Sequence, residues 1–68
     1  MAETRRNEVN RIRKELDWNI SQVAEFMGVP ERTMYRWLKQ GEGVGERTAF
    51  RIECGLEALR IAQERITA

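Results

Sequence analysis

The twenty residues from Ile20 to Lys39, ISQVAEFMGVPERTMYRWLK, constrain the fold most, because their pattern fits two short helices joined by a tight turn. Val23 and Met27 repeat at helical spacing after Ser21, which we expect to cap the first of these helices. Gly28 follows, and glycine reaches the left-handed backbone conformation without a Cβ penalty. It therefore ends the first helix and turns the chain toward the second.

The second helix of the pair is predicted over residues 30–40. Pro30 presets the backbone φ of its first turn and lacks an N–H that would be unpaired there. Met34, Trp37 and Leu38 recur at helical steps and form the side that we expect to be buried. The residues left on the outward side are Glu31, Arg32, Tyr35, Arg36 and Lys39.

The remainder of the chain also follows helical patterns, and no stretch alternates as a strand would. A helix is predicted before the pair, over residues 4–17, and a long one after it, over residues 46–66. The glycine-rich segment 41–45 reads as a flexible connection between them. We therefore expect a single all-α domain of four to five helices over residues 1–68.

The last helix, residues 46–66, is apolar on two opposite sides at about 100° per residue. One stripe contains Ala49, Ile52, Leu56, Leu59 and Ile66. The other contains Phe50, Cys54, Ala58 and Ile61. So small a chain can hardly bury both, so we expect the second stripe to form a homodimer interface. Cys54 is expected to be a buried small hydrophobe or, on a dimer face, a thiol that can cross-link on oxidation. Gly55 marks either a close helix crossing or a break in this helix.

Charge is distributed unevenly although the formal net charge is only +1. The first helix carries Arg5, Arg6, Arg11, Arg13 and Lys14. Acidic residues concentrate toward the C-terminus, so we expect a basic face and an acidic opposite end. Arg5 and Arg6 fit either a solvated helix face or a flexible arm.

Several classes of protein are disfavoured by what the sequence lacks. Without histidine, and with Cys54 as its one cysteine, the chain has neither an internal disulfide nor the usual zinc ligands, so no metal or cofactor is expected. The single serine is better used as a helix cap than as a nucleophile, so we expect neither an enzyme nor a small-molecule substrate. No apolar stretch approaches membrane-spanning length, and a cytoplasmic protein with no membrane partner is expected.

The central segment resembles the helix-turn-helix of lambda-repressor-like and Cro-like transcription regulators. The matching apolar, small and glycine positions are Val23, Ala24, Met27, Gly28, Val29, Met34 and Trp37. Outside this segment the resemblance is one of architecture, with one helix before the pair and one after it. It departs from the family at Ser21 and Gln22, which lead almost directly into Val23, so the first helix of the pair is about half a turn shorter.

This resemblance implies that the second helix of the pair enters the major groove of double-stranded DNA. The expected base-reading residues are Glu31, Arg32, Tyr35 and Arg36. The expected phosphate contacts are Ser21, Gln22, Thr33, Lys39 and Arg47. Arginine offers a planar fork that suits guanine, so one of Arg32 and Arg36 would read a base while the other holds a phosphate. Glu31 either accepts from cytosine or complements the helix dipole.

We expect a homodimeric repressor that binds an inverted-repeat operator overlapping a promoter. The resemblance implies a phage or mobile-element setting, which includes autorepressors of anti-CRISPR operons. Two alternatives remain open. In one, the chain is an antitoxin that binds DNA and also sequesters a toxin protein through its C-terminal helix. In the other, it is a helical protein-interaction module that does not bind DNA, and the low net charge favours this alternative.

Overall fold

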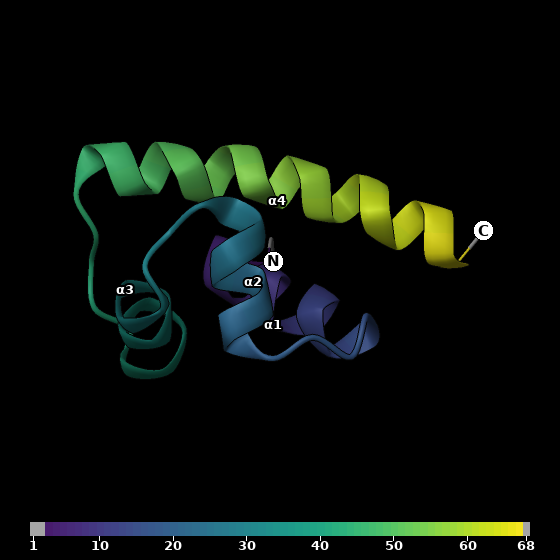
Figure 1. Ribbon diagram of the computed structural model, residues 1–68, viewed down its shortest axis with the longest axis horizontal. Coiled ribbons are helices and arrows are strands. Elements are labelled where there is room, and N and C mark those ends of the chain that lie inside the picture. Colours follow the sequence, from purple (N-terminus) through teal and green to yellow (C-terminus); the bar gives the residue numbers. More distant parts are fainter. Residues whose placement is uncertain (1–2, 68) are drawn as a thin grey trace.

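The computed structural model describes residues 3–67, which form four α-helices and one π-helical turn (Figure 1). The elements are α1 (Arg5–Glu15), α2 (Ile20–Met27), α3 (Glu31–Tyr35), the π-helical turn η1 (Arg36–Gln40) and α4 (Glu46–Thr67). No strand occurs in this described part of the chain, so the expected all-α fold is confirmed.

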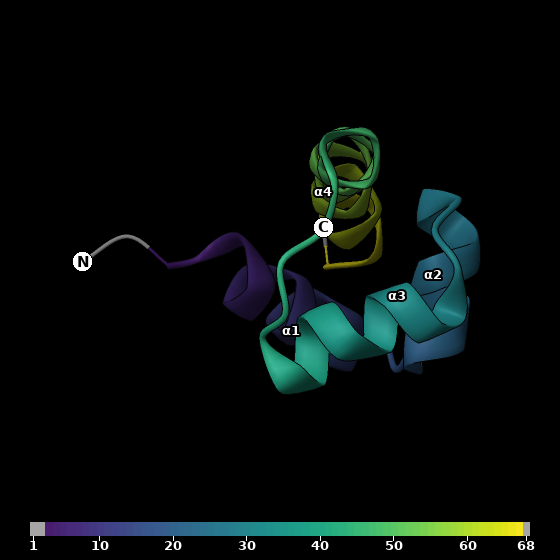
Figure 2. The same cartoon turned by 90° about the vertical axis from the view of Figure 1, so that its left-hand side faces the viewer.

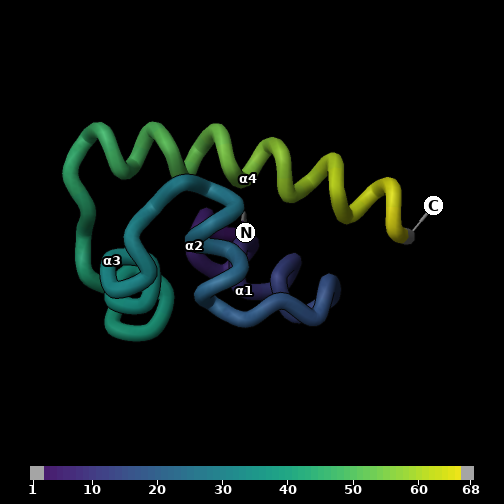
Figure 3. Tube along the Cα trace, viewed as in Figure 1, coloured from purple at the N-terminus to yellow at the C-terminus, as the bar shows by residue number. Residues whose placement is uncertain are grey.

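The long helix α4 lies along one side of the molecule, with α1 and α2 packed beneath it (Figures 1 and 2). The pair formed by α3 and η1 lies on the other side of the core, below the start of α4, where it packs on α2 and α1 (Figures 1 and 3). The helix-turn-helix is therefore held between a supporting helix, α1, and a covering helix, α4.

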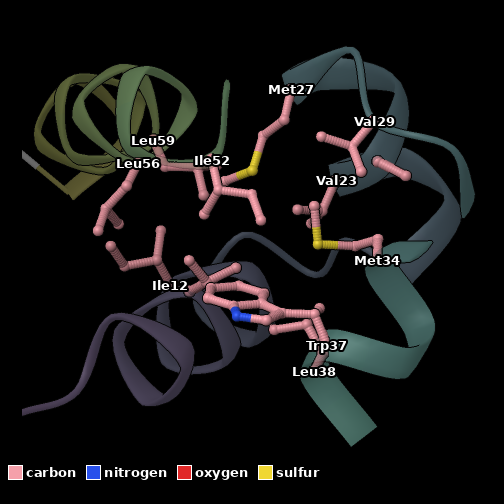
Figure 4. Packing of buried hydrophobic residues seen from close by; sticks show 12 residues of the cluster. Ile12, Val23, Met27, Val29, Met34, Trp37, Leu38, Ile52, Leu56 and Leu59 are labelled. Atoms are coloured by element: carbon pink, nitrogen blue, oxygen red, sulfur yellow. The ribbon is translucent and has the colours of Figure 1, made fainter. Parts of the chain in front are cut away.

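The core is built from the apolar sides of all these helices (Figure 4). Ile12, Val23, Met34, Ile52 and Leu59 are among the side chains that are fully buried. Trp37 and Leu38 join Met34 in the core, which confirms the buried side predicted for the second helix of the pair. Because Met34, Trp37 and Leu38 face the core, the opposite side of α3 and η1 lies outside it.

The cap of α2 is Asn19, so the prediction that Ser21 caps this helix is wrong. The Asn19 Oδ1 atom accepts from the Gln22 backbone N–H at 2.8 Å, and the Gln22 Oε1 atom accepts from the Asn19 N–H at 2.8 Å. This reciprocal pair is a capping box, which satisfies two N–H groups that a helix start leaves unpaired. Ser21 already lies inside the first turn.

The turn between α2 and α3 has the predicted left-handed glycine, with Gly28 at φ 71°. Its N–H donates to the carbonyl oxygen of Glu25 at 3.2 Å, and the Val29 N–H donates to that of Ala24 at 2.9 Å. These two bonds form a Schellman motif. The carbonyl of Gly28 in turn accepts from Arg51 Nη1 at 2.8 Å, so a side chain of α4 fixes the turn.

Two helix boundaries differ from the prediction, and a third helix ends at Gln40 as predicted but with a different geometry. The first helix ends at Glu15 rather than at Asp17, which takes a left-handed backbone (φ 59°) that the short polar side chain of aspartate tolerates. Pro30 stands before α3 as its N-cap, with an extended ψ of 138°, rather than as its first helical residue. The second half of the expected reader helix is the π-helical turn η1, which ends at a left-handed Gly41.

Helix α4 continues through Gly55, so the close crossing is confirmed and the break is excluded. A Cβ at this position would overlap the side chain of Met27, which shows that α2 meets α4 here. Two other expectations for this helix are wrong. Cys54 is exposed, and Ile66 is 64% exposed because this end of α4 extends past α1 and α2 (Figure 1).

Candidate nucleic-acid interface

The outward side of the recognition helix, which we define as α3 with η1, carries the predicted set of polar and aromatic residues. Glu31, Arg32, Tyr35, Arg36 and Lys39 are all exposed. Arg32, Tyr35 and Lys39 make no side-chain hydrogen bond or ion pair with any other residue among 3–67. Their hydrogen-bonding groups therefore face solvent and are accessible to a nucleic acid.

One shallow depression joins the recognition helix to the start of α2. It is lined by Ser21, Glu31, Tyr35 and Lys39, together with Asn19, Ile20 and Arg13. The structure therefore places a predicted phosphate contact, Ser21, on one surface with two predicted base readers. A helix-turn-helix uses such a surface to touch the backbone with one helix while the other reads bases.

A second depression lies on the other flank of the recognition helix, against the linker to α4. Its lining includes Thr33, Arg36, Gly43, Gly45 and Thr48. The Arg36 Nε atom lies 4.0 Å from Glu42 Oε2, and both side chains are about half exposed. Exposed pairs of this kind contribute only about 0–1 kcal/mol, so a phosphate or base edge can replace Glu42 as the partner of Arg36.

Two of the predicted phosphate contacts lie apart from both depressions. The side-chain oxygen of Gln22 is occupied by the capping box, which leaves its amide group as the remaining donor. Arg47 is exposed in the first turn of α4, directly after the glycine-rich linker. Neither residue lines either depression. Their phosphate contacts stay predictions.

The arginines of α1 do not form the free basic face expected from the sequence. The Arg5 Nη2 atom lies 2.6 Å from Glu53 Oε1 of α4. Arg11 binds both carboxylate oxygens of Glu3 at 3.2 Å. The ion pairs neutralise this part of the basic cluster, because the covering helix and the N-terminal segment bring carboxylates to it.

Two further α1 arginines hold backbone carbonyls. Arg6 Nε donates to the carbonyl oxygen of Trp37 at 2.5 Å, and its guanidinium lies 5.5 Å from the centroid of the Trp37 ring. Arg13 is buried and donates to Asn10 Oδ1 at 3.0 Å and to the Trp18 carbonyl oxygen at 3.3 Å. Neither is available as an arm or phosphate contact. The basic surface of the recognition helix is thus supplied by Arg32, Arg36 and Lys39.

Sequence reasoning missed that Arg6 and Arg51 position the interface. Arg6 holds the end of the recognition helix, and Arg51 holds the turn before it. Their partners lie 31 and 23 residues away in the chain, so no local pattern reveals them. The cap at Asn19 did have a signal, since Asn19 and Gln22 stand at capping-box spacing.

One perturbed ionisation lies away from this interface, between α1 and α4. Glu8 of α1 accepts from Arg60 of α4 at 2.7 and 2.8 Å, and this hydrogen-bonded pair lowers the pKa of the Glu8 carboxyl. The same contact raises the pKa of the Arg60 guanidinium. The pair fastens α4 to α1. Within residues 3–67 there is no cluster of three or more metal-ligating side chains. None of the described helices has the length and hydropathy needed to cross a membrane.

The family of the chain follows from residues 9–46, more than half of its length, which match the model of the homeodomain-like domain. The matched range runs from α1 through the helix-turn-helix to the first residue of α4. The chain therefore belongs to the homeodomain-like family of helix-turn-helix DNA-binding domains. No curated protein and no solved structure matches it. The helix-turn-helix part of the sequence resemblance is confirmed, and the lambda-repressor-like type stays a prediction.

Proposed function

We propose that this chain is a sequence-specific regulator of transcription that binds double-stranded DNA with the recognition helix in the major groove. One observation carries the proposal: Glu31, Tyr35 and Lys39 are exposed on one surface with the start of α2, and the next residue of α3, Arg32, is exposed as well. In a helix-turn-helix domain, this is the surface that meets the duplex.

The roles of the individual residues follow from their chemistry and position. Arg32 lies among the outward residues without a protein partner and is suited to a bidentate contact with guanine. Arg36, on the linker flank, exchanges Glu42 for a phosphate or a second base. Glu31 and Tyr35 read neighbouring base edges. The backbone contacts are assigned to Ser21, Gln22, Thr33, Lys39 and Arg47.

The regulator acts as a repressor that occupies an operator overlapping a promoter, in the cytoplasm of a bacterial or phage-infected cell. It binds as a homodimer to an inverted repeat, and simple occupancy blocks the polymerase. A phage or mobile-element operon, including one that carries an anti-CRISPR gene, is the setting that the sequence resemblance implies.

The test is selection of bound duplexes from a random double-stranded pool at near-physiological salt, followed by sequencing. An enriched inverted repeat with half-sites about one helical turn apart is the expected result. Arg32→Ala is the matched control and should lose preference at one position of each half-site. A folded protein that enriches no sequence would overturn the proposal.

A second candidate function is favoured by the exposed apolar stripe of α4, which includes Phe50 at 66% exposure. An antitoxin would use this face to sequester a toxin protein while the recognition helix binds DNA. A toxin gene adjacent to this one, with a product that co-purifies with the chain, would support it. If the chain is instead an interaction module that does not bind DNA, the selection will enrich no duplex, which distinguishes it from both the repressor and the antitoxin.

A further inference from the structure

The recognition helix lies between two depressions, one on each of its long sides. The depression toward α2 is lined by residues that include Tyr35 and Lys39, and the depression toward the linker by residues that include Thr33 and Arg36. The linker, residues 41–45, runs from the end of η1 to the start of α4 (Figure 1). A helix with its side chains is about as wide as the major groove. Under the proposed function, on which this inference rests, each flank of the inserted helix therefore meets one of the two phosphate backbones.

The depression toward the linker, which we call the linker depression, contains one charged side chain of each sign. Among the described residues that line it, Arg36 and Glu42 are the charged ones. The Arg36 Nε atom and the Glu42 Oε2 atom lie 4.0 Å apart. Thr33 and Thr48 also line the depression, and their hydroxyl groups make no hydrogen bond within residues 3–67. A cation and two hydroxyl groups suit a phosphate, but the cation already has a carboxylate beside it.

The turn that ends the recognition helix places Glu42 on this flank. Gly41 takes a left-handed backbone at φ 71°, and the Glu42 N–H donates to the carbonyl oxygen of Arg36 at 3.3 Å. This bond folds the start of the linker back against the last turn of the recognition helix. Glu42 is therefore held beside Arg36 by the backbone as well as by the attraction between the two charges.

We infer that Glu42 is a built-in competitor of DNA, because its carboxylate occupies the place on Arg36 that a backbone phosphate takes when the recognition helix enters the major groove. Carboxylate and phosphate both offer two oxygens to the planar fork of a guanidinium. When a duplex binds, Arg36 exchanges the carboxylate for the phosphate, and Glu42 then lies close to a second negative charge. Glu42 thus weakens binding to DNA of every sequence, since a phosphate carries no sequence information.

The exposure of the pair allows this exchange. The side chains of Arg36 and Glu42 are 54% and 55% exposed. An ion pair so accessible to water and salt shifts an equilibrium by no more than about fivefold, so a phosphate can displace the carboxylate. On the opposite flank, Lys39 makes no ion pair within residues 3–67, and a phosphate there has no carboxylate partner to displace. The linker flank is therefore the one that limits affinity.

Neutralising Glu42 tests the competition. Glu42→Gln keeps the size of this exposed side chain and should bind a random-sequence duplex about three- to fivefold more tightly than wild type at low salt. The logarithm of its affinity should fall more steeply with the logarithm of salt concentration, by about 0.9, as expected for one additional phosphate. Titrations followed by fluorescence anisotropy at several salt concentrations measure both changes.

Glu64→Gln is the matched control for the loss of one negative charge. Glu64 is exposed near the far end of α4. Because salt screens charges beyond about 10 Å, this variant should bind DNA within about twofold of wild type. If Glu42→Gln binds no more tightly than Glu64→Gln, the inference is overturned.

A double-mutant cycle shows whether Glu42 acts through Arg36. Arg36→Gln removes the cation, so adding Glu42→Gln to it should change DNA affinity by less than about twofold. An equal gain with and without Arg36 would mean that Glu42 only repels DNA as a general charge, which overturns the competition. The gain from Glu42→Gln alone should be the same on a selected duplex and on a random one. A gain confined to the selected duplex would show that Arg36 reads a base and would contradict the inference.

Failure of the competition and failure of the proposed function give different results. If the chain selects a duplex but the effect of Glu42→Gln does not depend on Arg36, DNA binding stands and the competition fails. If no duplex of any sequence binds, the proposed function fails, and inorganic pyrophosphate becomes the probe, followed through the NMR signal of the Arg36 Nε–H group. Glu42→Gln should then still bind pyrophosphate more tightly than wild type, and an equal affinity would overturn the competition as well.

Discussion

Arginine plays two different roles on the two helices that flank α2. On α1, Arg5 and Arg11 bind carboxylates, while Arg6 and Arg13 bind backbone carbonyls. On the recognition helix, Arg32 is exposed and makes no side-chain hydrogen bond or ion pair within residues 3–67. The difference comes from the neighbours: α1 packs against α4 and η1, which supply acceptors, whereas the outward side of α3 faces no other element. Local charge density therefore does not show which arginines are free to bind a ligand, because packing against other helices decides it.

The largest expected effect is the loss of folding stability in Arg13→Ala, which removes one of the α1 arginines that bind backbone carbonyls. Its removal leaves the Trp18 carbonyl without its side-chain donor and opens space in a buried position, so unfolding should become easier by about 2–3 kcal/mol. Urea denaturation measures this. Lys14→Ala, at the neighbouring exposed position, should change stability by less than about 0.5 kcal/mol. An equal loss of stability in both variants would show that Arg13 contributes no more to the fold than an exposed lysine.

Replacing the recognition-helix arginines should weaken DNA binding and not folding stability. Arg32→Ala and Arg36→Ala should leave stability unchanged and weaken DNA binding by about 1–3 kcal/mol each. A base-reading arginine also relaxes specificity at one base pair, whereas a phosphate contact weakens all sequences alike and reduces the salt dependence. Titration of matched and mismatched duplexes at two salt concentrations separates these cases. A loss of folding stability in either variant would show that this arginine supports the fold, as the α1 arginines do.

Arg6 links folding stability to the recognition helix, because it belongs to α1 and donates to the Trp37 carbonyl of η1. Arg6→Gln removes the charged donor to the Trp37 carbonyl and the cation–π contact, at a cost of about 1–2 kcal/mol in stability. DNA affinity should fall with it, since Trp37 lies in η1. Arg6→Lys keeps the charge and should recover part of both losses. DNA affinity that is unaffected while stability falls would show that η1 does not depend on Arg6.

The smallest effect is expected at the ion pair between Glu8 and Arg60. The folded state lowers the pKa of Glu8 below its unfolded value of about 4.3, so the pair stabilises the fold above that pH and stops doing so as the pH falls through the folded pKa. Wild type should therefore melt at a higher temperature than Glu8→Gln at neutral pH, and the gap should narrow as the pH falls through the lowered pKa of Glu8. A gap in melting temperature that is unchanged at pH 3 would assign the stabilisation to something other than ionisation.

Much of the interface was predictable because it depends on short-range pattern. Gly28 in the turn, the inward Met34 and the outward Arg32 follow from helical spacing and from the conformational freedom of glycine. The π-helical turn has no comparable local signal, and it replaced the regular end expected for the reader helix. The partners of Arg6 and Arg51 depend on how distant helices pack, which periodicity does not encode.

The exposure of Cys54 illustrates the same limit on α4. The sequence assigned the stripe with Ile52, Leu56 and Leu59 to the core, and these residues are buried, but it did not show how α4 meets its neighbours. The arrangement is set by shape: Gly55 allows close contact with Met27 on one side, which turns Ile52 inward and Cys54 outward. Gly55 thus marks the place where the side chain of Met27 approaches α4 most closely.

Arg51 has a consequence for regulation. Its guanidinium donates to the carbonyl oxygen of Gly28 in the turn between α2 and α3, and the same side chain is exposed on α4. Thermodynamic linkage requires that any effect transmitted through this residue be reciprocal. Under the proposed function, a protein partner that engages Arg51 and thereby strengthens DNA binding is itself bound more tightly, by the same factor, when the DNA is bound.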